Sequence, residues 1–187
     1  FAGTDVPDYR LEVRYDADGQ VVDQDDAYRF LPTLGDVDLH LIGEGRHETL
    51  WTVLGAHRRA YASLHGEVVG TSFAVWAPSA LGVRLVCDAN NWDGTAFPLR
   101  SLGSSGVWEL FVPDLGDGTR YKFEILGQDG VRRTKADPMA RHTEHPPQTA
   151  SVVFTSDYAW GDDAWLRDRA VHDPHVGPMS VYEVHLG

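Results

Sequence analysis

The sequence predicts a mainly β fold with two consecutive β-sandwich (immunoglobulin-like) domains. Apolar and polar residues alternate in several short runs, which is the pattern of strands that bury one face. Turn-forming residues separate these runs, and the chain contains 19 Gly, 10 Pro, six Trp, seven Tyr and seven Phe, a composition typical of short elements. With 187 residues, of which 42% are hydrophobic, the chain is long enough for one large or two small cores.

Residues 1–62 are expected to form a truncated N-terminal β-rich domain. Residues 9–15 alternate cleanly between apolar and charged side chains, and residues 20–22 can return as the second strand of a hairpin. Residues 36–42 fit either a strand with a period of two or one face of a short helix. Residues 49–55 predict one or two helical turns that end at a glycine.

Residues 63–156 are expected to form the second sandwich, because short strand patterns recur there with turn signals between them. The length suits an immunoglobulin-like domain, although the Cys-Trp-Cys pattern of true immunoglobulin domains is absent. The expected strands lie near residues 70–78, 83–88, 107–112, 121–126, 131–134 (the weakest pattern) and 150–155.

Residues 157–178 hold Trp160, Trp165 and two prolines in a polar context, so we expect an irregular linker. Residues 179–187 alternate again and predict the start of a new strand. The chain begins with Phe1 and stops inside this pattern, and we therefore expect it to be part of a longer protein.

The charge of the chain argues against two classes of partner. A formal net charge of -12 repels phosphate backbones and anionic lipids, and no basic stripe offsets it. We therefore expect no nucleic acid and no membrane as partner, whereas a neutral polysaccharide would not feel this charge. Cys87 is the only cysteine and lies in an apolar run, which predicts a buried, inert thiol. Together with the lack of an apolar stretch of about 20 residues, this suits a cytoplasmic protein.

A turn after the second strand of residues 63–156 offers the best candidate for a binding site. Asn91 and Trp92 stand in the run Asn-Asn-Trp-Asp-Gly, whose residue types favour a turn with the Trp at its tip. Strand alternation places Lys122 outside the core, on the same strand as inward-facing Tyr121 and Phe123. The indole of Trp92 could stack on a glucose ring while Asn91 and Lys122 reach its hydroxyl groups. The alternative is a Trp packed on its own sandwich and a solvated Lys.

Three other patterns contain residue types that could carry chemistry. His142 and His145, and likewise His172 and His175, have a spacing that metal ligands use, but prolines crowd both pairs and neither has a convincing third ligand. The segment 43–45, Gly-Glu-Gly, lacks the strand-to-helix setting of a phosphate-binding loop. We therefore expect no metal and no cofactor.

Three stretches resemble a known family. Residues 70–94 (GTSFAVWAPSALGVRLVCDANNWDG), 106–125 (GVWELFVPDLGDGTRYKFEI) and 135–141 (KADPMAR) are similar to carbohydrate-binding modules of family 48. Such modules precede the catalytic barrel in bacterial glycogen branching enzymes. Residues 30–57 resemble the additional N-terminal domain of the longer branching enzymes, and residues 181–187 (VYEVHLG) resemble the first strand of their barrel.

The resemblance implies a fold, an activity and partners. The chain would be the N-terminal part of a glycogen branching enzyme that ends with the first strand of a truncated (β/α)8 barrel, here residues 179–187. Such enzymes cleave α-1,4-glucan chains and transfer them to 6-hydroxyls by a retaining double displacement that uses two carboxylates. The partners would be an α-glucan (glycogen or amylose) and the protein's own catalytic barrel. No catalytic residue is assigned, because the catalytic groups of a barrel stand at the ends of later strands.

The resemblance also implies binding residues. Glucan-binding members of the family use a Trp in an Asn-Trp turn, a Lys on a Tyr-Lys-Phe strand and a second aromatic residue shortly afterwards. Trp92 and Lys122 match the first two, whereas Val131 and Arg132 stand where the second aromatic is expected. Direct glucan contact and bracing of the barrel both remain open for this module. Two alternative functions are a debranching or trehalose-releasing relative and a non-catalytic glucan-binding regulatory module.

Overall fold

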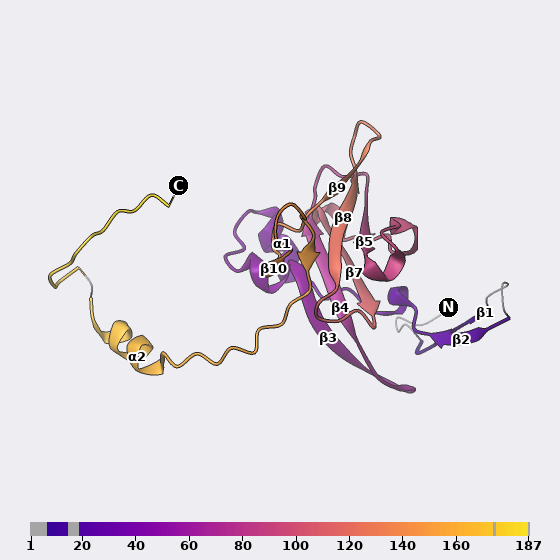
Figure 1. Ribbon diagram of the computed structural model, residues 1–187, viewed down its shortest axis with the longest axis horizontal. Helices are drawn as coiled ribbons and strands as arrows, with labels where there is room; N and C mark the ends of the chain where they lie inside the picture. The colour runs from indigo at the N-terminus through magenta and orange to yellow at the C-terminus, as the bar shows by residue number, and fades with distance from the viewer. Residues whose placement is uncertain (1–6, 15–18, 174, 187) are drawn as a thin grey trace. The chain divides into compact units, whose positions relative to one another are not determined.

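The computed structural model describes residues 7–14, 19–173 and 175–186. The chain divides into two compact units, Phe1–Thr155 and Ser156–Gly187. Strands are the predominant regular structure of the first unit, which confirms the mainly β fold predicted from the sequence (Figure 1).

Two antiparallel sheets form the sandwich of the first unit. One sheet has the order β3-β4-β7-β6, and the other has the order β10-β11-β8-β5 with β9 also paired to β8. The strands of the first sheet are β3 (Gly55–Ser63), β4 (Gly66–Trp76), β7 (Val107–Pro113) and β6 (Arg100–Ser101). Those of the second are β10 (His142–Thr143), β11 (Ser151–Val152), β8 (Arg120–Leu126), β5 (Gly82–Cys87) and β9 (Arg132–Lys135).

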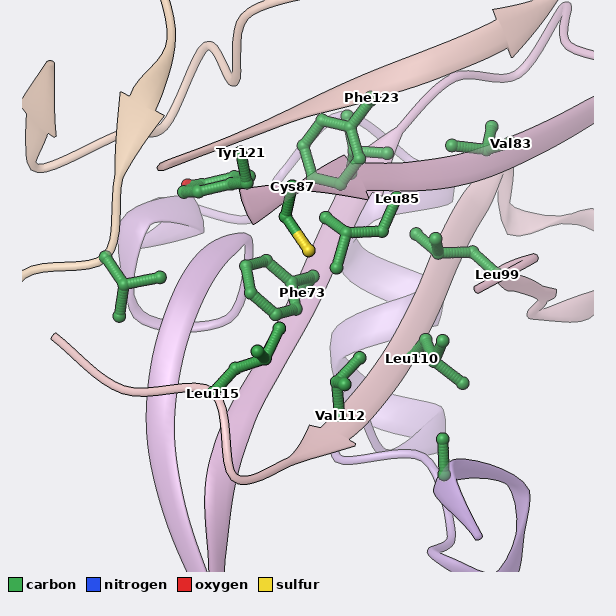
Figure 2. Packing of buried hydrophobic residues seen from close by; sticks show 13 residues of the cluster. Phe73, Val83, Leu85, Cys87, Leu99, Leu110, Val112, Leu115, Tyr121 and Phe123 are labelled. Carbon is green, nitrogen blue, oxygen red and sulfur yellow. The ribbon is translucent and has the colours of Figure 1, made fainter. Parts of the chain in front are cut away.

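The core lies between these two sheets and consists mainly of alternate residues of their strands, with loop residues such as Leu99 and Leu115 (Figure 2). Phe73 of β4 and Leu110 of β7 face Leu85 of β5 and Tyr121 of β8, and all four are at most 1% exposed. The rings of Phe73 and Tyr121 meet edge to face with centroids 4.9 Å apart. Cys87 is fully buried beside them, as predicted, and burial raises the pKa of its thiol.

The sandwich begins earlier in the chain than the expected boundary between residues 62 and 63. β3 pairs with β4 in an antiparallel register that runs from Gly55 opposite Ala74 to Ser63 opposite Gly66. The expected boundary therefore falls at the tip of a β-hairpin. Gly55 opens the strand with a φ of 100°, a conformation that favours glycine. The strand patterns assigned to two domains thus share one sheet.

Residues 30–54 cover the outer face of the first sheet instead of forming a sandwich of their own. The ambiguous segment 36–42 is helical, as α1 (Asp36–Gly43), and short 3-10 turns occur at η1 (Ala27–Arg29) and η2 (Leu50–Thr52). A second apolar cluster joins this segment to the sheet through Leu34, Ile42 and Leu54, which pack with Ala74 and Val107.

One buried carboxylate fixes the same segment to the sheet. Glu109 of β7 is 2% exposed and accepts hydrogen bonds from the backbone N–H of Thr33 at 2.8 and 3.0 Å and from its hydroxyl at 2.6 Å. Because a buried charge must be compensated, these bonds hold residues near Thr33 close to the sheet.

The N-terminal hairpin predicted from the sequence is present. β1 (Leu11–Arg14) pairs with β2 (Val21–Gln24) in an antiparallel sheet of two strands. Residues 15–18, which include Tyr15 and most of the predicted turn, lie outside the described residues.

The second unit differs from the expected irregular linker by containing a helix, α2 (Asp163–Val171). Asp163 lies in its first turn and Arg169 in its last turn, which suits the helix dipole. The Arg169 guanidinium lies 5.1 Å from the ring centroid of Trp165, one helical turn earlier. Residues 179–186 belong to no strand, and the predicted barrel strand there stays a prediction.

Candidate functional site

Trp92 lies at the tip of a tight turn at the end of β5. The turn consists of η3 (Asp88–Asn90), then Asn91 and Trp92, and η4 (Gly94–Ala96). Asn91 and Trp92 have φ values of 52° and 61°, in the left-handed region. Asn tolerates this conformation, but a bulky Trp rarely adopts it, and such backbone outliers concentrate at binding sites. The Trp92 side chain is 40% exposed and is therefore not a core plug.

Hydrogen bonds from the preceding strand hold this turn in place. The Asn90 amide accepts a bond from the N–H of Cys87 at 2.8 Å and donates one to the carbonyl of Leu85 at 2.9 Å. The N–H of Trp92 donates to the carbonyl of Cys87 at 3.0 Å. Asn90 thus has a structural role, and its neighbour Asn91 has an exposed side chain.

The three predicted site residues lie toward the outer face of the second sheet. A Cβ added to Gly94 would stand 2.8 Å from the Arg84 Cβ and 3.3 Å from a Val86 methyl group, so the turn lies against the outer face of β5. Val86 pairs with Lys122 of β8, which places Lys122 on the same face. The sheet therefore brings the Trp92 turn and Lys122 to one region of the surface.

Thr149 is a member of this region that the sequence did not indicate. The Lys122 ammonium donates a hydrogen bond to the Thr149 hydroxyl at 2.7 Å, so the lysine is not merely solvated. Thr149 lies 27 residues farther along the chain, before β11, and no local pattern links it to Lys122.

Val131 lies at the other end of β8 from the Trp92 turn. It occupies the β8–β9 turn, where its carbonyl accepts from the N–H of Gly127, and it is 49% exposed. Leu126, the last residue of β8, is four residues from Lys122, or about 13 Å along a strand. An aromatic residue at position 131 would therefore enlarge the site along the strand, and the present chain lacks that extension.

A charged group borders the site at the start of β8. Arg120 contacts the carboxylate of Asp88, the first residue of the Trp92 turn, through three hydrogen bonds of 2.9 to 3.1 Å. Burial raises the pKa of Asp88, but the hydrogen bonds and charge of Arg120, with a smaller contribution from the Trp92 side chain, outweigh it and lower that pKa overall. Sequence reasoning missed both residues, because 32 positions separate them.

These residues offer chemistry suited to a neutral, hydroxyl-rich ligand. An exposed indole face can stack on the C–H face of a sugar ring, while an ammonium, an amide and a hydroxyl can bond to hydroxyl groups. Among residues 7–14, 19–173 and 175–186, no cluster of three or more His, Cys, Asp or Glu could hold a metal ion. Within the same residues, no helix is long and apolar enough to cross a membrane.

Comparison with known proteins finds a matching family model and similar proteins. Residues 53–140 match the family model described as carbohydrate-binding module 48 (isoamylase N-terminal domain). The 1,4-alpha-glucan branching enzyme GlgB of Frankia casuarinae is 64% identical over 183 residues, which make up 97% of this chain and 22% of that protein. The GlgB of Thermobifida fusca is 64% identical over 185 residues, covering 99% of this chain and 25% of that protein.

The chain thus spans about a quarter of the length of the curated relatives that it matches. Among solved structures, pullulanase from Bacillus acidopullulyticus matches 55% of this chain and 12% of its own, with 24% identity and a TM-score of 0.41. The matched range of the family model begins just before β3 at Gly55, in agreement with the observed start of the sandwich. The resemblance to carbohydrate-binding modules of family 48 is confirmed: residues 53–140 match that family model, in a chain similar over nearly its whole length to 1,4-alpha-glucan branching enzymes.

Proposed function

We propose that this chain is the N-terminal part of a glycogen branching enzyme. The observation that carries the proposal is 64% identity to GlgB proteins over 97% and 99% of the chain. The whole enzyme would cleave an α-1,4 bond of a linear glucan and transfer the released segment to a 6-hydroxyl, forming an α-1,6 branch. It would act in the cytoplasm, in keeping with a single buried thiol, and would need no cofactor.

In this proposal the parts of the chain have separate tasks. Catalysis belongs to a barrel whose first strand is residues 179–187, and residues 157–178 connect the module to it. The chemistry would be a retaining double displacement with one carboxylate as nucleophile and another as acid and base. The catalytic carboxylates would stand on later barrel strands, so the described residues contribute substrate binding and support of the barrel.

The proposed glucan contact is the face formed by Trp92, Asn91 and Lys122. The Trp92 indole would stack on one glucose ring, and the Asn91 amide and the Lys122 ammonium would donate hydrogen bonds to its hydroxyl groups. Lys122 is already oriented by Thr149, which lowers the entropy cost of fixing its long side chain on binding. The net charge of -12 does not oppose a neutral glucan.

The branching activity is tested with the polypeptide that includes the region downstream of residue 187. Incubated with amylose, this protein should produce α-1,6 linkages that isoamylase digestion releases as short chains. Residues 1–187 alone should produce none. Failure of the longer protein to form branches, with amylose merely hydrolysed or unchanged, would refute the proposed activity.

The glucan contact is tested separately by affinity electrophoresis of the 187-residue chain through gels that contain amylose. Trp92→Ala should migrate faster than wild type, because it has lost the stacking surface. Trp51→Ala is the matched control, since Trp51 is 58% exposed and lies in η2, on the segment that covers the other sheet. Equal retardation of the wild type and Trp92→Ala would show that this indole does not hold glucan.

A further inference from the structure

Arg120 joins two segments that border the proposed glucan contact. One is the Trp92 turn, whose first residue is Asp88. The backbone N–H of Arg120 and its Nε atom both donate to Asp88 Oδ2, at 3.0 and 3.1 Å. Its Nη2 atom donates to Asp88 Oδ1 at 2.9 Å. Because the guanidinium donates to both carboxylate oxygens in a bidentate arrangement, it fixes the orientation of Asp88 as well as its position.

The other segment lies on the opposite side of β8. The Nη1 atom of Arg120 reaches Glu144 Oε1 at 3.4 Å. Glu144 Oε2 in turn accepts a hydrogen bond from the N–H of Ala150 at 3.0 Å, and the N–H of Glu144 donates to the Ala150 carbonyl at 2.9 Å. Ala150 follows Thr149, the residue that orients Lys122. One guanidinium is therefore linked to the Trp92 turn and to the segment whose Thr149 orients Lys122.

We propose that Arg120 is a positioning residue for glucan binding: it holds the Trp92 turn and the Thr149 segment at the spacing that one glucan chain requires. The proposal rests on the glucan contact described under the proposed function. Arg120 itself need not touch sugar, since its polar atoms are engaged by Asp88 and Glu144.

The backbone conformation of the Trp92 turn explains why the contacts of Arg120 are needed to hold it. Asn91 and Trp92 both have positive φ values, and the left-handed conformation is unfavourable for a bulky residue such as Trp. A turn in this state relaxes unless its surroundings hold it. The Asp88 contact holds the start of the turn, and the glucan then meets an indole already in place, which reduces the ordering cost of binding.

The same contacts should matter little for global stability. The Arg120 and Asp88 side chains are 52% and 34% exposed, and exposed ion pairs usually contribute little to folding. The chain also offers a matched control. Arg133 and Asp129 form an ion pair of 2.6 Å with exposures of 49% and 52%, in the β8–β9 hairpin away from the Trp92 turn.

The test measures maltoheptaose affinity of the 187-residue chain by isothermal titration calorimetry, with folding checked by urea unfolding. Arg120→Ala should weaken binding about tenfold. Without Arg120, one or two groups of the Trp92 turn and the Thr149 segment are mobile, and binding must order them. Arg120→Lys should recover part of the lost affinity, because it keeps the charge but not the bidentate contact with the Asp88 carboxylate. Arg133→Ala should bind within about twofold of wild type.

A double-mutant cycle separates positioning from a general structural effect. Because Arg120 also holds the Thr149 segment, Arg120→Ala should cause a smaller loss of affinity in a Trp92→Ala background than in the wild type. Full additivity of the two losses, or wild-type affinity of a folded Arg120→Ala, would overturn the positioning role. Absence of binding by the wild type would instead refute the proposed glucan contact itself, so the two failures are distinguishable.

Discussion

Removal of one hydroxyl group from the core should destabilise the strand that carries the proposed site. Tyr121 lies between Arg120 and Lys122 on β8 and is 0% exposed (Figure 2). Its hydroxyl donates a hydrogen bond of 2.6 Å to Asp137 Oδ2, and Asp137 is only 6% exposed. Tyr121→Phe keeps the ring and deletes this bond, so the buried carboxylate loses a donor.

The expected loss of stability in Tyr121→Phe follows from the burial of this hydrogen bond. Hydrogen bonds to charged groups contribute about 1.5–3 kcal/mol, and a buried acceptor left without its donor falls in that range. Since about 1 kcal/mol shifts Tm by about 2–4 °C in a chain of this size, Tm should fall by roughly 3–12 °C. The free energy of unfolding is measured by urea titration, with an unchanged slope as evidence for the same folded state.

Tyr28→Phe provides the control for Tyr121→Phe. The Tyr28 hydroxyl donates to the carbonyl of Pro98 at 2.7 Å, but the residue is 39% exposed, so water can replace the lost donor. The control should lose no more than about 1 kcal/mol. A Tyr121→Phe variant as stable as Tyr28→Phe would refute the reasoning that the buried Tyr121–Asp137 bond stabilises the sandwich.

Asp137, the acceptor of the Tyr121 hydrogen bond, should also make the stability of the chain depend on pH. Burial raises the pKa of Asp137, and the bonds from Tyr121 and from the N–H of Met139 counter it only in part. Because the folded pKa lies above the unfolded value of 3.8, the contribution of Asp137 to stability is complete below that value and is lost as pH rises through the folded pKa. A carboxyl titration by NMR should show this raised pKa, and Tyr121→Phe should raise it further.

Three further changes probe other parts of the structure. Gly94→Ala would bring a Cβ to 2.8 Å from the Arg84 Cβ and should cost about 1–3 kcal/mol by urea unfolding, together with lower amylose retention; unchanged retention would show that the turn adapts. Hydrogen bonds from Arg133 lower the pKa of Asp129 to about 2, so their stabilisation should be present above pH 3.8 and be lost as pH falls through about 2; an NMR titration near 3.8 would contradict this. Phe73→Ala, at 0% exposure, should cost about 3–5 kcal/mol, and a loss below about 1 kcal/mol would place the core elsewhere.

The strands that border the core were predictable because every second residue is apolar over a run long enough to show the period. In β5 the residues Val83, Leu85 and Cys87 are buried on the inner face, while Arg84 lies on the outer face, as the period of two requires. β6 and β10 have two residues each and are too short to show any period. The structure therefore agrees with the sequence where the strand is long and one of its faces is apolar.

The start of the sandwich was misplaced because β3 lacks such alternation. Arg58 of β3 pairs with Thr71 and occupies an inward-facing position, where an apolar residue is the usual choice. Its guanidinium instead donates to the backbone carbonyls of Gly70 and Leu115. A charged side chain whose partners are backbone atoms far along the chain leaves no local pattern, so the strand resembled a polar connection.

The residues of the candidate site likewise fall into two groups, those that the sequence indicates and those that it does not. Trp92 could be found from its turn, because Asn and Gly neighbours signal a turn locally. The orientation of Lys122 followed from strand alternation, and its position on the outer face agrees with that expectation. Thr149 and Arg120 could not be found, because their roles depend on contacts over 27 and 32 residues of sequence that only the sheet brings together.

We propose that an α-glucan binds at the Trp92 turn. Titration of the isotope-labelled 187-residue chain with maltoheptaose, followed by NMR, tests it most directly. The largest shifts should occur at the Trp92 indole N–H and at the backbone of Asn91, Lys122 and Thr149, with the Trp51 indole unchanged. Shifts confined to other residues, or no shifts at millimolar sugar, would contradict it.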